Sequence, residues 1–309
     1  MKAVGVKTGR KTFLKNVKRS RWLYLIFALP FLYFIVFKYG AMVWLVIAFE
    51  DFKAFKGVFG SKWVGLKWFK AFINDPYFWN IVKNTIVLNL WSIVICFPAP
   101  ILLALLINEV KCRAFKKFTQ TVSYLPYFLS TVVVCGFITN IVASDGLINQ
   151  LLKAMGMETV TFLMEPGWFR PIYVLSELWQ GCGWGSIIYL AALAGVDQQL
   201  YEAASIDGAS KLQQLLHISL PGIVSVISIQ FLLTIGRILS IGYEKIILLY
   251  NGATYETADV ISTYVYRRGL LEANYSYGAA VSIFQSVIAL FLVVIANKAA
   301  KKVGQTSLW

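Results

Sequence analysis

Long apolar stretches separated by polar segments run through this 309-residue chain. A helix needs roughly 20 apolar residues to cross the hydrocarbon core of a bilayer, and six stretches reach that length. They cover about residues 22–46, 80–107, 121–143, 171–195, 220–243 and 277–297. The pattern predicts an all-α integral membrane protein with six transmembrane helices, in which the prolines of the first two stretches are tolerated as kinks.

Composition supports a membrane protein and argues against an enzyme. Hydrophobic residues make up 58% of the chain and charged residues 14%, with a mean hydropathy of +0.67, which is too apolar for a soluble globule of this length. The sequence holds no G-x-x-x-x-G-K-[ST] phosphate loop and no set of nucleophile, base and orienting group, and His217 is its single histidine. We therefore expect no catalysis, no metal site and no cofactor bound by this chain.

The distribution of charge predicts which side of the membrane each loop faces. Sixteen Lys and Arg and four acidic residues lie in four segments: the N-terminal tail, residues 108–120, residues 196–219 and the C-terminal tail. The loops on the opposite side carry ten Lys and Arg and ten acidic residues. Because loops rich in Lys and Arg stay on the inner side of the membrane, both termini and the 196–219 loop are predicted to be cytoplasmic.

The basic tail, residues 1–21, admits a second interpretation. Runs of Lys and Arg also occur in segments that bind nucleic acid. This run lacks interleaved aromatic residues and leads directly into an apolar stretch. We interpret it as a topology signal that contacts anionic lipid headgroups, and we expect no nucleic-acid partner.

A polar segment between the fourth and fifth stretches has the features of a helix-turn-helix. Asp197 is placed to cap a short helix over residues 198–206, and Gly208 suits the left-handed position that ends a helix. Ser210 and Gln213 have the spacing of a capping box that opens a second helix. The first helix carries too little apolar surface for a core of its own, which indicates that it docks against a partner.

The same segment carries a motif that resembles a known family. It is similar to the EAA loop of permease subunits of binding-protein-dependent ABC importers, and it reads Glu202-Ala203-Ala204, three residues, Gly208, nine residues, Ile218, one residue, Leu220-Pro221. Four further segments resemble the carbohydrate-uptake branch, in particular permeases for oligosaccharides derived from polysaccharides. They are residues 63–66, 123–126, 183–190 and 274–277.

This resemblance implies the type I ABC importer permease fold in a single transmembrane domain, residues 1–309, with a core module at about 80–298 and the coupling loop at 197–221. The loop would dock onto a dimer of cytoplasmic ATPase subunits, which bind ATP and Mg. The implied coupling residues are Glu202, Ala203, Ala204, Asp207, Gly208, Ala209, Leu220 and Pro221. A second homologous permease and an extracytoplasmic solute-binding protein would complete the importer in a bacterial cytoplasmic membrane, working by alternating access.

Polar residues that recur at helical spacing inside the spans are candidates for the substrate pathway, because such residues share one face of a helix. An ionisable residue in a span usually faces the protein interior or a water-filled cavity. The candidates are Glu177, Gln180 and Trp184 in the fourth span, Gln230, Thr234 and Arg237 in the fifth, and Gln285 in the sixth, with Asn84, Asn89 and Ser92 in the second.

Two interpretations of Glu177 and Arg237 stay open. In the first, they form a salt bridge between two helices, because an unpaired charge at that depth is costly. In the second, the polar faces line the translocation cavity, Trp184 and Trp179 offer flat faces to pyranose rings, and Arg237 meets a uronate carboxylate through a charge-assisted hydrogen bond.

The sequence does not name the sugar, its length or its charge. The main alternative function is an ion-coupled secondary sugar carrier, which would need titrating acids inside the spans. Among the predicted spans Glu177 alone qualifies, and no inverted repeat of broken helices is evident. The resemblance therefore implies a membrane subunit of an ATP-driven importer that forms the pathway for an oligosaccharide, with an acidic, uronate-containing sugar among the expected substrates.

Overall fold

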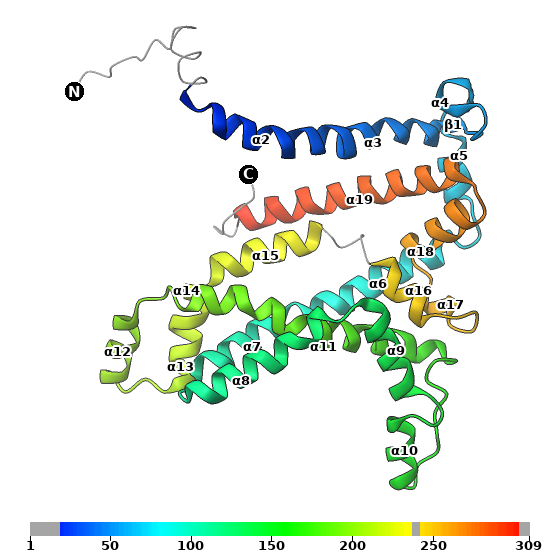
Figure 1. The fold of residues 1–309 in the computed structure, drawn as a ribbon. Helices are drawn as coiled ribbons and strands as arrows, with labels where there is room; N and C mark the ends of the chain where they lie inside the picture. Colours follow the sequence, from blue (N-terminus) through cyan, green and yellow to red (C-terminus); the bar gives the residue numbers. More distant parts are fainter. Residues whose placement is uncertain (1–18, 237–241, 303–309) are drawn as a thin grey trace. The chain divides into compact units, whose positions relative to one another are not determined.

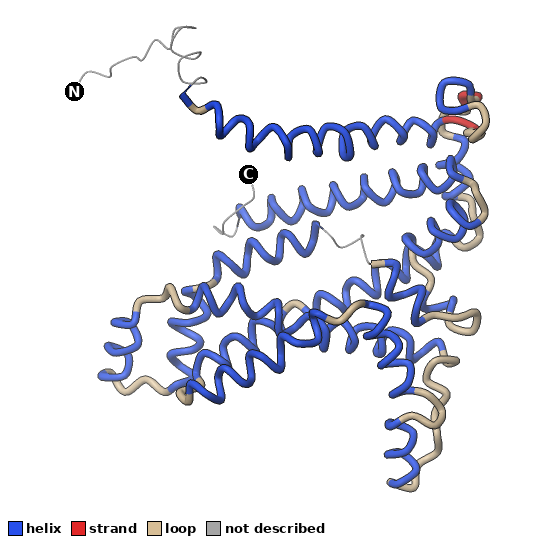
Figure 2. The backbone as a smooth tube through the Cα atoms, viewed as in Figure 1, coloured by secondary structure: helices blue, strands red, loops and turns tan. Residues whose placement is uncertain are grey.

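A computed structural model describes residues 19–236 and 242–302, and these are mostly helical. The ribbon shows the order of the helices (Figure 1), and the backbone tube shows how short most of the connections between them are (Figure 2). The chain divides into two compact units, Met1–Lys67 and Trp68–Trp309, and each unit is described by itself.

The described part of the first unit begins with a long apolar helical segment. Arg21–Phe49 is 29 residues long and apolar enough to cross a membrane, which agrees with the first predicted stretch. Most of its large apolar side chains are exposed, as expected for a surface that meets lipid or another subunit. The segment consists of α2 (Arg21–Tyr33), the π-helix η1 (Phe34–Tyr39), α3 (Gly40–Val43) and the 3-10 helix η2 (Trp44–Phe49).

A short hairpin follows this segment. Strand β1 (Glu50–Asp51) pairs antiparallel with β2 (Lys62–Trp63), so that Glu50 lies opposite Trp63. The helix α4 (Gly57–Gly60) lies between the two strands in sequence, and α5 (Lys67–Ile73) leads into the second unit.

In the second unit, α11 (Pro166–Leu193) is the central helix and packs along α6 (Phe78–Cys96) and α7 (Pro98–Glu109). The last two form one candidate span, Phe78–Glu109, of 32 residues. The change of helix falls at Pro98, where proline removes a backbone donor. The second predicted stretch is therefore confirmed as a candidate span, interrupted where its prolines lie.

The third predicted stretch was wrong in its boundaries. The candidate span is Thr131–Ala154 and not 121–143. The preceding helix ends ahead of Pro126, and a new helix starts where the Ser130 side chain accepts a hydrogen bond from the backbone N–H of Val133, so a helix cap overrides the continuous apolar pattern. The elements of this region are α8 (Arg113–Tyr124), the 3-10 helix η3 (Leu125–Phe128), α9 (Thr131–Val142) and α10 (Leu147–Ala154).

The C-terminal half continues as short helices joined to two longer ones. Lys211–Gly222 and Val224–Gly236 meet at a bend of 61° and form a fifth candidate span if they are taken together. The elements are α12 (Gln198–Ile206), α13 (Lys211–Gln214), the π-helix η4 (Leu215–Ser219), α14 (Leu220–Gly222), α15 (Val224–Gly236), α16 (Tyr243–Leu249), α17 (Tyr255–Ala258), α18 (Ile261–Val265), the π-helix η5 (Tyr266–Leu271) and α19 (Tyr275–Lys302).

The described residues contain four helices long and apolar enough to cross a membrane, or five with the bent pair. The fourth of them, Tyr275–Lys298, agrees with the last predicted stretch. The predicted span 171–195 lies in α11, whose 28 residues are long enough but include Glu177 and Gln180, which lower its mean hydropathy. The predicted number of six spans is thus met in part.

Three clusters of buried apolar side chains hold the second unit together. One joins α6, α11 and α16 through Leu88, Val174 and Ile246. Another gathers α5, α6, α18 and α19 around Phe72, and the third joins α7 and α11 to Ile223, the residue before α15. Burial of this apolar surface fixes α6, α11 and α15 around a common space.

Candidate functional site

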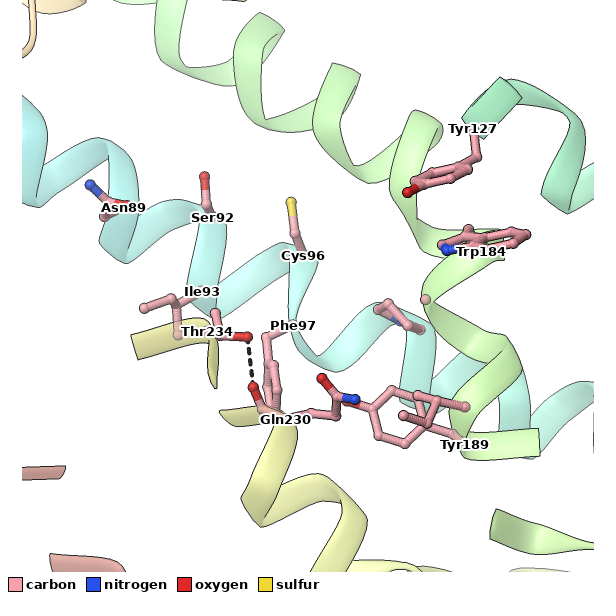
Figure 3. A pocket seen from close by; sticks show the side chains of 13 residues that line it. Asn89, Ser92, Ile93, Cys96, Phe97, Tyr127, Trp184, Tyr189, Gln230 and Thr234 are labelled. Atoms are coloured by element: carbon pink, nitrogen blue, oxygen red, sulfur yellow. Dashed lines mark hydrogen bonds between the residues drawn. The ribbon is translucent and has the colours of Figure 1, made fainter. Parts of the chain in front are cut away.

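A cavity of about 580 Å³ opens between α6, α11 and α15 in the second unit. Figure 3 shows Asn89, Ser92 and Cys96 following one another along α6 on one side of it. Trp184 of α11 and Gln230 and Thr234 of α15 belong to the lining as well, so with Asn89 and Ser92 five of the predicted pathway residues come together here. The lining is Asn89, Ser92, Ile93, Cys96, Phe97, Pro100, Tyr127, Trp184, Gly185, Ile188, Tyr189, Gln230 and Thr234.

An aromatic pair forms one wall of this cavity. The rings of Trp184 and Tyr127 stack with centroids 4.7 Å apart and planes 4° from parallel, and Figure 3 shows the two rings lying over one another. One face of Trp184 is therefore covered by Tyr127. Trp179, the other predicted sugar platform, does not line the cavity and stacks on Phe137 at 5.7 Å.

Glu177 and Gln180 hold a buried lysine that the sequence analysis missed. Glu177 forms a salt bridge with Lys245, and the Lys245 ammonium also donates a hydrogen bond to the Gln180 side-chain oxygen at 2.7 Å. The expected partner of Glu177 was Arg237, which lies outside the described residues. The span boundaries had placed Lys245 in a loop, and a lysine within the apolar run of α16 was the signal available to find it.

Glu177 and Gln180 do not line the central cavity, and two further predicted pathway residues also lie elsewhere. Gln285 is half-buried on α19 and is not among the described residues that line the cavity. Asn84 is buried, and its amide donates hydrogen bonds to the carbonyls of Glu256 and Asp259. Helical spacing predicts which residues lie on the same face of a helix. The packing of the helices decides whether that face meets the cavity or another helix.

The predicted helix between the fourth and fifth stretches is confirmed with its caps. α12 begins after Asp197, whose carboxylate accepts a hydrogen bond from the Gln199 N–H at 2.9 Å. Gly208 adopts a φ of +79°, the left-handed conformation. Ser210 and Gln213 form the capping box, with reciprocal hydrogen bonds of 3.3 and 2.7 Å.

α12 stands at one end of the second unit, joined to it by two loops (Figure 1). None of its residues is buried, and Ile206 is 86% exposed. The helix is held against the following elements by a hydrogen bond between the Tyr201 and Ser219 hydroxyls and by one that the Gln214 amide donates to the Ser205 hydroxyl, each 2.9 Å long. An exposed apolar side chain on a helix held in place in this way suits docking against another protein.

The predicted coupling residues fall into three groups around this helix. Glu202, Ala203, Asp207 and Gly208 are exposed. Ala204 and Ala209 border a hollow of about 240 Å³ that His217 also lines. Leu220 and Pro221 lie in α14, next to the 61° bend that leads into α15.

Comparison with known proteins gives consistent matches over the length of the chain. The family model described as "Binding-protein-dependent transport system inner membrane component" matches residues 96–304. The polygalacturonan/rhamnogalacturonan transport system permease protein YteP of Bacillus subtilis (strain 168) is 45% identical over 304 residues, which are 98% of this chain and 95% of YteP.

Two solved structures have the same fold at 40% sequence identity. The first is the crystal structure of a bacterial ABC transporter involved in the import of the acidic polysaccharide alginate, with a TM-score of 0.87 over 94% of this chain and 98% of that one. The second is the bacterial alginate ABC transporter in complex with its periplasmic protein bound to an alginate pentasaccharide, with a TM-score of 0.88 over 95% and 99%. The chain therefore belongs to the family of binding-protein-dependent transport system inner membrane components, the permease subunits of ABC importers.

Proposed function

We propose that this chain is the membrane subunit of an ATP-driven importer for acidic, uronate-containing oligosaccharides. The observation that carries the proposal is the 45% identity over 98% of the chain to a permease named for polygalacturonan and rhamnogalacturonan, names that denote polymers containing galacturonate. The similarity to a transporter of alginate, an acidic polysaccharide, supports the same substrate class.

The cavity has the chemistry that a sugar needs. Its volume of about 580 Å³ falls within the ~300–1,000 Å³ of ligand sites. Asn89, Ser92, Gln230 and Thr234 bring amide and hydroxyl groups suited to sugar hydroxyls, and the edge of the Trp184–Tyr127 pair brings apolar surface. From the sequence pattern we also assign Glu177, Gln180, Arg237 and Gln285 to the pathway, and Arg237 would meet a uronate carboxylate.

Coupling to ATP hydrolysis is assigned to α12 and its flanks. We place the 196–219 loop and both chain termini in the cytoplasm. We also count α11, the fourth apolar stretch in sequence order, as a transmembrane span, which brings the number of spans to six. A dimer of ATPase subunits, which hold ATP and Mg, would seat α12 in a cleft, and its closure would move α12 as a lever. Because α12 is capped at its start and stopped at Gly208, it can transmit that displacement through α13 and α14 to α15.

The remaining partners complete the importer. A second homologous permease would form the other half of the pathway, and a solute-binding protein would deliver the sugar to the outer face of a bacterial cytoplasmic membrane. The solved complex of the alginate transporter with a sugar-bound periplasmic protein supports this arrangement.

Reconstitution in liposomes tests the function. The chain, its partner permease, the ATPase and the binding protein should import trigalacturonate when ATP is supplied, and an ATPase that lacks its phosphate-loop lysine should abolish the import. Uptake that persists without ATP would instead favour the ion-coupled carrier.

The Arg237→Met substitution tests charge selection in the pathway. Import of trigalacturonate should fall while import of a neutral galactose trisaccharide is unchanged, because only the acidic sugar needs the guanidinium. Equal loss of both activities together with a lower protein level would indicate a structural role for Arg237.

A further inference from the structure

A second cavity, of about 620 Å³, lies between the start of α6 and the segment from α17 to the end of η5. Figure 1 shows α17 and α18 near α6, and both contact it. None of the residues assigned to transport lines this cavity. Its lining is Tyr77, Asn80, Tyr255, Glu256, Asp259, Tyr264, Arg267, Arg268 and Glu272.

The walls of this outer cavity are held by buried polar contacts. The Asn84 amide donates hydrogen bonds to the carbonyl oxygens of Glu256 and Asp259 at 2.8 and 3.1 Å. The Thr85 hydroxyl accepts one from the backbone N–H of Ile261 at 3.0 Å. These contacts pin the 256–261 segment to α6, so the cavity is preformed.

Tyr264 lines the outer cavity, and its hydroxyl stays protonated. It is 2% exposed and donates a hydrogen bond of 2.5 Å to Asp75. Burial raises the pKa of Tyr264 above its ordinary value, and the hydrogen bond to Asp75 raises it further. The ring is thereby fixed in place beneath the two arginines.

The backbone around the arginines departs from regular helix. Arg267 and Arg268 lie in the π-helix η5, a conformation found frequently at functional sites. Two residues after η5, Ala273 has a φ of +54°, which is unusual for a residue other than glycine. Strained backbone of this kind clusters at ligand-binding sites, so it points independently to the same place.

The two arginines differ in how firmly they are held. Arg267 makes two hydrogen bonds to the Asp259 carboxylate, at 3.3 and 2.5 Å, and lies over the Tyr255 ring at 4.9 Å. Arg268 pairs with Glu272 at 2.8 Å and also lies over the Tyr264 ring at 6.0 Å, and the Arg268 and Glu272 side chains are close to half exposed, at 46% and 47%. An exposed ion pair on one helical segment contributes little stability, so another carboxylate can take the place of Glu272 at low cost.

We propose that this outer cavity is a second binding subsite for the acidic sugar, in which the carboxylate of one uronate residue replaces Glu272 on Arg268. The pyranose ring would lie against Tyr77 or Tyr255, and the Arg267–Asp259 pair would serve as a fixed wall. This inference rests on the proposed function, and in the topology proposed above the cavity faces the outside of the cell. It would hold the chain of sugars on the membrane's outer face while one end enters the central cavity.

The dimensions favour a sugar over a loop of the binding protein. A stable protein–protein contact buries roughly 800 Å² on each partner, whereas this site is a cavity of the size that holds a small ligand. Its mixture of guanidinium, carboxylate, amide and tyrosine groups offers donors, acceptors and ring faces together, which suits a molecule covered with hydroxyls and carrying a carboxylate.

Substitutions of Arg268 and of Glu272 should have opposite effects on sugar binding, and this tests the proposal. Binding of trigalacturonate is measured in the purified complete transporter without its binding protein. Arg268→Gln should weaken this binding by about tenfold or more, because the loss of a charge-assisted hydrogen bond reduces affinity by about that factor. Glu272→Gln should strengthen that binding, because it removes the carboxylate that competes for Arg268. Binding of a neutral galactose trisaccharide should not change in either variant.

Other outcomes overturn the proposal in distinguishable ways. If the wild-type transporter imports trigalacturonate but both variants bind it as the wild type does, or both lose binding equally, the subsite is wrong and the proposed function stands. If Arg268→Gln weakens docking of the sugar-free binding protein but not binding of the free sugar, the cavity serves the binding protein. If the wild-type transporter neither imports nor binds trigalacturonate, the proposed substrate class is wrong and the subsite falls with it.

Discussion

The ion pair between Glu177 and Lys245 is unequally exposed to water. The Lys245 side chain is 5% exposed, whereas that of Glu177 is 41% exposed. A charge removed from water depends on its partner for stabilisation. Lys245 therefore depends on Glu177 more than Glu177 depends on Lys245, and Gln180 supplies Lys245 with one neutral acceptor in addition.

This inequality predicts the outcome of breaking the pair from either side. Glu177→Met should lower the free energy of unfolding by about 3 kcal/mol or more, since it leaves a buried charge unpaired, and Lys245→Met should cost less. The double variant should recover much of the loss because two apolar side chains replace the pair. Thermal unfolding of the four purified transporters measures this, and equal single losses with an additive double variant would contradict it.

Single residues in the spans were predicted as far as local spacing allows. Trp184 lines the central cavity with Gln230, whereas Glu177 and Gln180, which have the same helical spacing, bind Lys245 instead. Spacing along one helix cannot say which helix a face meets. The partner of Glu177 comes from α16, a short helix 65 or more positions farther along the chain, and no pattern near Glu177 points to it.

Among the elements, α12 is stabilised at its ends and not by a core. It has no buried residue, so its two caps supply a large share of its order. An N-cap side chain contributes about 1 kcal/mol, and a residue with a Cβ in the left-handed position of Gly208 costs a similar amount. Loss of either cap should loosen the helix without disturbing the spans.

We accordingly expect Asp197→Ala and Gly208→Ala to uncouple transport from ATP hydrolysis. The amount of sugar imported per ATP hydrolysed should fall severalfold, while the amount of transporter assembled in the membrane stays unchanged. Gln199→Ala is the matched control, because it alters an exposed side chain of the same helix and raises helix propensity. If both cap variants keep the wild-type ratio, rigidity of α12 is not what transmits the motion.

The ends of α12 were predicted from its capping residues, whereas the start of α9 was missed because its cap, Ser130, lies inside a longer apolar run. The ends of α12 follow from Asp197 and Gly208, which act on adjacent backbone groups. The third stretch looked like one span because apolar residues continue through Pro126, yet the helix restarts at the Ser130 cap. A run of hydrophobic residues reports that a segment is apolar and not whether one helix covers it.

For the whole molecule, the arrangement across the membrane that we propose rests on the distribution of charge. The two loops and two tails assigned to the cytoplasm carry most of the positive charge, and the +14 net charge of the chain is concentrated there. In the proposed topology, the loop that leads into α8 lies on this cytoplasmic side. It contains Cys112, which is exposed, whereas Cys96, Cys135 and Cys182 are half-buried or buried.

Cys112 is therefore a native probe of the orientation. A membrane-impermeant maleimide should label it in inside-out vesicles and not in intact spheroplasts, because the 108–120 loop is expected in the cytoplasm. A Cys112→Ser variant carrying Glu158→Cys, in the loop before α11, should show the reverse pattern. Labelling of Cys112 from the outside would invert the proposed topology and remove α12 from reach of an ATPase.

By itself, the sequence determined what neighbouring residues decide: the apolar length of most spans, the caps of α12, and the motif by which the chain resembles its family. Each of these depends on groups within a few turns of one another. Only the tertiary structure decided which faces meet, as when Asn84 bonds to residues 172 and 175 positions away and Lys245 reaches Glu177. Such contacts depend on how each helix rotates and crosses its neighbours, and that is settled by the packing of the whole unit at once.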